Sequence, residues 1–166
     1  MTCAWIDDDE RGQCGKREYK TSKYCFEHKA KAHKIWVDRN KEQAEERQKQ
    51  RDKFAAIQKE AIEAGMEAGK NCIPEPMIVF DNITGEMGKV DSGGKGMAWI
   101  VHRNGRDKFS YWGRKYGNWK KHHYGGIQYW CFEFKQSLEK KQAFCRAFAK
   151  VLNNNGINAM AQSRED

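Results

Sequence analysis

A long stretch of helix-forming residues, from Lys29 to Lys70, limits what this chain can fold into more than any other feature. It is rich in Ala, Glu, Lys, Arg and Gln, and it holds neither a proline nor a run of β-branched residues. This composition predicts one continuous helix, because these residue types lose little conformational freedom in helical form. We expect Gly65, Gly69 and the segment Ile73–Pro76 to end the helix and to start a new domain.

The two halves of this helix differ in their apolar content. Between Asp38 and Lys53 the only apolar residue is Ala44, and a helix that is polar all round usually bridges solvent or spans between domains. Further on, apolar residues recur at alternating steps of three and four: Phe54, Ile57, Ala61, Ala64 and Ala68. Two interpretations of this stripe stay open, namely packing on the following domain and a homodimer through residues 54–68.

Residues 71–166 have the pattern of short strands followed by a helix. Strands are expected at Met77–Phe80, Met97–His102, Lys108–Trp112 and Ile127–Phe134. The Asn104-Gly105 pair between the second and third of these predicts a hairpin turn. Several glycines between Glu86 and Gly96 predict a loop.

A last helix is expected to begin after Ser137 and to stop at Asn153–Gly156. Its apolar face consists of Phe144, Ala147, Phe148, Val151 and Leu152. The fold class is therefore α+β, with an antiparallel sheet covered on one face by this helix. Because Leu138 and Leu152 are the only leucines and aromatic residues reach 12%, rings must fill much of the core. We interpret Cys72, Cys131 and Cys145 as buried thiols.

Three cysteines and a histidine near the N-terminus have the spacing of a zinc site. Ten residues separate Cys3 from Cys14 and Cys14 from Cys25, and two separate Cys25 from His28. Thiolates and an imidazole bind Zn²⁺ tetrahedrally, and four protein ligands leave no open position, which is typical of a structural ion. Disulfides are the alternative. The lysine-rich composition and the lack of an apolar secretory segment near Met1 favour a reducing, intracellular compartment, cytoplasmic or nucleoid or nuclear.

The string Lys23–His28 and the cysteine spacing resemble the CCCH zinc finger of the WRC type, which occurs in plant growth-regulating transcription factors and is associated with DNA binding. Cys3–Trp5, Cys14-Gly15 and Tyr24-Cys25 are similar to the cysteine–histidine segment of GcrA-type bacterial cell-cycle regulators. Both resemblances end near Ala32. They imply a role connected with transcription or nucleic acid, and four ligands of one zinc ion: Cys3, Cys14, Cys25 and His28.

Three segments follow from these patterns: a finger at residues 1–32, a charged helix at 33–70 and a sheet-and-helix domain at 71–166. The chain carries a net charge of +8. Residues 71–166 hold fifteen basic and nine acidic side chains, hence +6, whereas residues 1–28 hold five and six, hence −1. Positive charge attracts polyanions in general. No apolar run approaches the roughly 20 residues that cross a bilayer, so no membrane partner is expected.

A basic and aromatic segment lies between Ile100 and Tyr124, where Asp107 is the only acidic residue. Cations bind phosphates while flat rings stack on bases, and single-stranded nucleic acid is bound by this combination. Nine residues are the candidate contacts: Arg103, Arg106, Lys108, Arg114, Lys115, Tyr116, Trp119, Lys120 and Lys121. The opposing interpretation is that the rings belong to the core and the cations face solvent, and a protein interface has a similar composition.

Catalysis has less support in the sequence. His122 and His123 are adjacent, so on a strand their side chains point apart, and no carboxylates accompany them at metal-site spacing. The glycine-rich Asp91–Gly96 lacks the Ser or Thr that follows the lysine of a phosphate-binding loop. We therefore expect a non-catalytic, regulatory, zinc-containing protein that binds DNA or RNA. The alternative is an adaptor or inhibitor, of phage or viral type, that docks on a protein through the finger and the helix.

Overall fold

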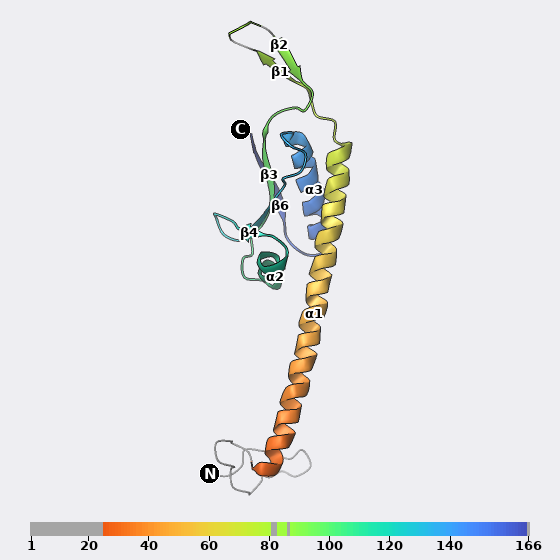
Figure 1. The fold of residues 1–166 in the computed structure, drawn as a ribbon, viewed down its shortest axis with the longest axis vertical. Coiled ribbons are helices and arrows are strands. Elements are labelled where there is room, and N and C mark those ends of the chain that lie inside the picture. Colours follow the sequence, from red (N-terminus) through yellow and green to blue (C-terminus); the bar gives the residue numbers. More distant parts are fainter. Residues whose placement is uncertain (1–24, 81–82, 86, 166) are drawn as a thin grey trace. The chain divides into compact units, whose positions relative to one another are not determined.

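The structure is a computed structural model that describes residues 25–80, 83–85 and 87–165 (Figure 1). Helix α1 runs from Phe26 to Asn71, so the long helix expected from the composition is confirmed. The chain forms two compact units, Met1–Gln50 and Arg51–Asp166, and the boundary between them falls inside α1. Helices and antiparallel sheets both occur, which confirms the α+β class.

Two glycines that were expected to end the long helix lie inside it instead. A Cβ atom placed on Gly65 would lie 2.7 Å from Cδ2 of Phe144, and one on Gly69 would overlap the ring of Phe134. These glycines therefore allow aromatic rings to approach the helix backbone closely. The expectation that they stop the helix was wrong because packing of the ring against the backbone outweighs the weak helix propensity of glycine.

A separate two-stranded hairpin follows the helix. Strand β1 covers Met77–Phe80, as predicted, and pairs antiparallel with β2, Met87–Val90. The sequence predicted a loop where β2 lies. In this ladder Gly88 lies opposite Val79, so its pairing across the hairpin outweighs the loop preference of the local glycines.

The main sheet has the strand order β4-β5-β3-β6 and is antiparallel throughout. The strands are β3 at Gly96–His102, β4 at Lys120–Lys121, β5 at Ile127–Trp130 and β6 at Met160–Glu165. Helix α3, Leu138–Asn154, packs against β3 and β6, which confirms the expected last helix and the sheet face that it covers (Figure 1). Strand β5 ends at Trp130, earlier than the predicted Phe134, and the chain then turns toward α3 at Phe134 and Lys135, which adopt positive φ angles of 65° and 49°.

The segment expected as a third strand is a helix. Helix α2 covers Lys108–Tyr116, and its buried residues recur at helical spacing: Phe109, Ser110, Trp112 and Gly113. The hairpin predicted at Asn104-Gly105 was wrong for a physical reason. A two-residue hairpin of this type needs positive φ at both central residues, and Gly105 is not among the glycines with positive φ.

Aromatic rings fill the core of the second unit, as the shortage of leucine predicted. Phe54, Ile57 and Ala61 of α1 are buried there together with residues of α2, α3 and the sheet. The Phe54 ring meets the Phe109 ring edge-on, with centroids 5.4 Å apart. Of the two interpretations of the apolar stripe in α1, the structure describes intramolecular packing. Within the described ranges, no helix combines the length and apolar character needed to cross a membrane.

Candidate nucleic-acid interface and metal ligands

Two of the four expected zinc ligands lie together at the start of α1. Cys25 directly precedes the helix and His28 lies in its first turn, and both side chains are buried. The Cys25 Sγ and His28 Nδ1 atoms are 3.4 Å apart. Tetrahedral zinc with ordinary Zn–S and Zn–N bonds holds sulfur and nitrogen about 3.6 Å apart, so this pair fits two corners of such a site.

The other two expected ligands, Cys3 and Cys14, lie outside the described residues. Among the residues that are described, no group of three or more His, Cys, Asp or Glu side chains is placed to hold a metal. The described pair accordingly needs further ligands from elsewhere to form a closed structural site.

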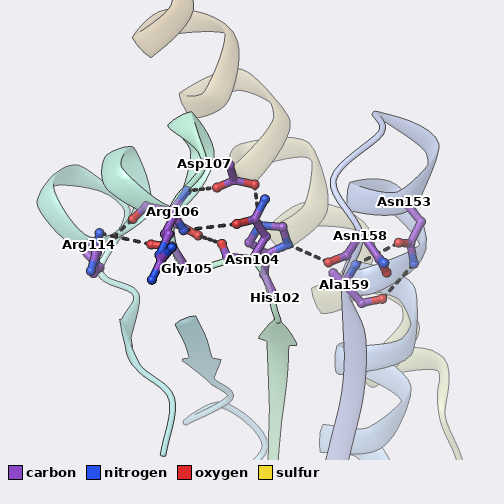
Figure 2. Close-up of polar contacts among 10 residues, drawn as sticks. His102, Asn104, Gly105, Arg106, Asp107, Arg114, Asn153, Asn158 and Ala159 are labelled. Carbon is purple, nitrogen blue, oxygen red and sulfur yellow. Dashed lines mark hydrogen bonds and ion pairs between the residues drawn. The ribbon is translucent and has the colours of Figure 1, made fainter. Parts of the chain in front are cut away.

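A buried histidine organises the loop between β3 and α2 (Figure 2). His102, at the end of β3, is 3% exposed, and its Nε2 lies 2.7 Å from Oδ2 of Asp107. Its Nδ1 lies 2.6 Å from the carbonyl oxygen of Asn158, which leads into β6. Because a carbonyl oxygen can only accept, Nδ1 donates this hydrogen bond. The imidazole thus connects the loop, the sheet and the start of α2.

Asp107 has a second partner, which explains why α2 begins where it does. Its Oδ1 accepts a hydrogen bond of 2.7 Å from the backbone N–H of Ser110 and so caps the helix. Both carboxylate oxygens are therefore engaged within the fold. The only acidic residue of the basic segment is thus held by His102 and by the start of α2, while its side chain stays 31% exposed.

Further hydrogen bonds fix the loop that carries Arg103 and Arg106. The Ser110 hydroxyl donates to the Asn104 carbonyl, and the Arg106 N–H donates to Oδ1 of Asn104 at 3.1 Å. From α2, Arg114 donates through Nε to the Ser110 carbonyl at 3.3 Å and through Nη2 to the Gly105 carbonyl at 3.4 Å (Figure 2). The loop backbone is thus held in one conformation while its arginines face outward.

Eight of the nine candidate contact residues are exposed, and they come from three neighbouring elements. They are Arg103 and Arg106 in the loop, Lys108, Arg114, Lys115 and Tyr116 in α2, and Lys120 and Lys121 in the edge strand β4. The ninth, Trp119, is 2% exposed, and its indole N–H donates to Oε1 of Gln58 at 2.8 Å. Its ring belongs to the core, so Trp119 is removed from the set of contact residues.

Exposed tyrosines and cations interact on the surface of α2. Lys115 Nζ lies 5.3 Å from the Tyr116 ring centroid and 5.9 Å from that of Tyr111. A hydrogen bond with Tyr116, followed by the charges of the two tyrosines, raises the pKa of Lys115, which therefore stays cationic. Arg51 of α1 also lies over the Tyr116 ring, with its Cζ 5.2 Å from the ring centroid. Arg51 was missed in the sequence because it lies far from this segment along the chain.

The structure also describes the adjacent histidines and the three cysteines that follow α1. His122 is buried and its Nδ1 accepts from the N–H of Tyr124, whereas His123 is exposed, so the two side chains point apart as expected. Cys131 and Cys145 are buried, as predicted. The prediction of a buried thiol was wrong for Cys72, which is partly exposed because it directly follows the end of α1, outside the core. A hydrogen bond with Cys131, together with burial, raises the pKa of the Cys145 thiol well above its usual range, which keeps it neutral.

Comparison of the chain with protein-family models, with curated proteins and with solved structures finds no match in any of the three.

Proposed function

We propose that this chain is a zinc-containing, non-catalytic regulatory protein that binds DNA or RNA through the basic interface formed by the β3–α2 loop, α2 and β4. The observation that carries the proposal is the position of Asp107. Its carboxylate is held by His102 and by the cap of α2, and among the described residues it forms no ion pair with any of the seven cations of this segment, which stay available to a ligand.

The interface has the chemical properties that phosphate binding requires. Arginine offers a planar set of donors that matches phosphate oxygens, and Arg103 and Arg106 stand on a loop whose backbone is fixed. Lysines contribute positive charge that releases counterions from the nucleic acid. A fixed backbone lowers the entropy that these side chains lose on binding.

Zinc has a structural role in this proposal. Cys3, Cys14, Cys25 and His28 would hold one ion with no open position, and the ion would order the segment that precedes α1. The supporting observation is the 3.4 Å separation of the Cys25 and His28 ligand atoms.

The proposal is tested by replacing Arg114, Lys115, Lys120 and Lys121 with alanine in the full, zinc-loaded chain. Affinity for nucleic acid should fall, and the slope of log affinity against log salt should flatten by about 3, since each phosphate contact contributes roughly 0.7 to 0.9. A matched control removes the same charge from exposed positions outside the interface: Lys89, Lys135, Arg146 and Lys150. The proposal fails if the unmodified chain binds neither DNA nor RNA in a salt-sensitive way.

A second candidate function, docking on a protein, is favoured by exposed apolar side chains. Trp36 of α1 is 63% exposed, and in the β1–β2 hairpin Ile78 and Met87 are 71% and 77% exposed. Large exposed apolar side chains that lie close together often mark protein interfaces. Replacing Ile78 and Met87 with serine, followed by capture from the native host, tests this alternative, because a bound protein should then be lost.

A further inference from the structure

One face of the main sheet packs against α3, and the opposite face, which we call the open face, carries the partly exposed Trp99 and Trp130 beside the fully buried Val101. Residues that pair directly across antiparallel strands lie on the same face. Ile100 pairs with Tyr129 and with Ala161, and these residues face α3 and the core. Trp99 alternates with Ile100 and therefore belongs to the opposite face, where it pairs with Trp130 of β5 and Gln162 of β6.

The two tryptophans form a fixed aromatic pair on this open face. Their ring centroids are 4.9 Å apart with an interplanar angle of 34°, and both residues are only partly buried. The Trp99 indole N–H donates to Oε1 of Gln162 at 3.0 Å, which orients that ring. The Trp130 indole N–H makes no hydrogen bond to any residue that the structure describes. A large, oriented ring surface is thus presented outside the core.

Charge on the open face is positive. Lys120 pairs with Gln128, and Arg164 pairs with Met97, so both cations lie on the same face as the tryptophans, one toward each edge of the sheet. Glu165 is the only acidic residue in the four strands. It pairs with Gly96, which lies on the same face of β3 as Ile100, so Glu165 belongs to the covered face. An anionic ligand that binds the open face therefore contacts cations and aromatic rings together. No acidic residue of the four strands repels it on this face.

We propose that the open face binds unpaired nucleobases, with Trp99 and Trp130 as a stacking platform and Lys120 as the link to the basic interface. This inference rests on the proposed function and narrows its substrate class to single-stranded nucleic acid. Bases in a duplex are already stacked and hidden, whereas bases of a single strand can place a ring against an indole. Lys120 belongs both to the basic interface and to the open face, so one strand can contact both.

The test uses the full, zinc-loaded chain with a single-stranded oligonucleotide and a duplex of the same length. Trp130→Ala should lower single-strand affinity about tenfold to a hundredfold, as loss of one stacked base does, and should leave duplex affinity and the salt slope unchanged. Trp130→Phe should retain most of the affinity. Trp36→Ala, at an exposed tryptophan of α1, is the matched control. It should change neither the affinity for the single strand nor the affinity for the duplex.

A second measurement keeps the test valid if Trp130→Ala does not fold. Ultraviolet crosslinking of the unmodified chain to the single-stranded oligonucleotide should yield adducts in peptides that contain Trp99 or Trp130. Adducts found only in other peptides would refute the proposal that Trp99 and Trp130 stack on bases. An unchanged single-strand affinity in a folded Trp130→Ala variant would refute it as well. Either of these two results would refute only the stacking platform and would be compatible with nucleic-acid binding by the basic interface. If the unmodified chain binds no nucleic acid at all, the proposed function itself is refuted.

Discussion

Among the charged residues of the basic segment, Asp107 should be the one whose loss destabilises the fold most, although it is the only acidic one. Its two oxygens serve the His102 ring and the Ser110 N–H. Removing a helix cap destabilises a protein by about 1 kcal/mol. Leaving a buried polar group such as His102 without its partner adds about 1 to 3 kcal/mol. Asp107→Ala should therefore lower the free energy of unfolding by about 2 to 4 kcal/mol.

Asp107→Asn separates the two contributions. Asparagine caps helices as well as aspartate does, and its amide can donate to Nε2 of a neutral His102 while Nδ1 still donates to Asn158. We therefore expect Asp107→Asn to retain most of the stability that Asp107→Ala loses. Equilibrium denaturation followed by circular dichroism measures the difference. For a unit of this size, Asp107→Ala should lower the melting temperature by about 8 to 16 °C.

Two results would refute this reasoning. A loss below about 0.5 kcal/mol in Asp107→Ala would mean that neither hydrogen bond matters to folding. Equal losses in the alanine and asparagine variants would mean that a carboxylate charge, and not hydrogen bonding, is what stabilises the loop. Lys108→Ala, at the exposed neighbouring position, is the control and should change stability by less than about 0.5 kcal/mol.

Three further predictions concern other parts of the chain. Gly65→Ala should destabilise the second unit by about 1 to 3 kcal/mol despite the better helix propensity of alanine, because the added methyl group meets the buried Phe144 ring; a gain in denaturation midpoint would contradict this packing. Cys25→Ser should remove the one equivalent of zinc that metal analysis is expected to find, whereas Cys72→Ser should retain it; a folded, metal-free unmodified chain would end the zinc assignment. In the native protein at pH 8, iodoacetamide should label Cys72 but spare Cys145, because the raised pKa of Cys145 keeps its thiol protonated below that pKa; mass spectrometry that finds early labelling of Cys145 would disprove its burial.

The elements that could be predicted from the sequence are those with sustained periodicity. The last helix and the second half of the long helix repeat apolar residues at helical spacing over several turns, while the first half of the long helix was predicted from its helix-forming composition; both helices were found. Helix α2 was missed because the Asn104-Gly105 pair is a strong local indication of a turn, which outweighed the capping signal of Asp107, whose carboxylate accepts from the Ser110 N–H. The tertiary contacts of the Phe109 and Trp112 rings with Phe54 of α1 favour the helix in this segment, and these contacts could not be read from the local sequence.

The candidate site was predictable only in part. The basic segment is continuous in the sequence, so its cations could be collected by inspection. Trp119 was assigned to the surface because composition does not distinguish a buried ring from an exposed one, and its partner Gln58 lies on α1. The Trp99–Trp130 pair could not be found, because only the register of β3 against β5 brings the two rings together.

The close approach of Phe144 to Gly65 makes these two positions dependent on each other. Since the Phe144 ring occupies the space that a side chain at position 65 would need, neither residue can vary freely while its partner stays the same. Any relative of this chain that retains the fold with a larger residue at position 65 must accommodate it at 144, by a smaller side chain or by a shift of α3. Correlated substitution at these two positions would therefore identify distant relatives even where the rest of the sequence has diverged.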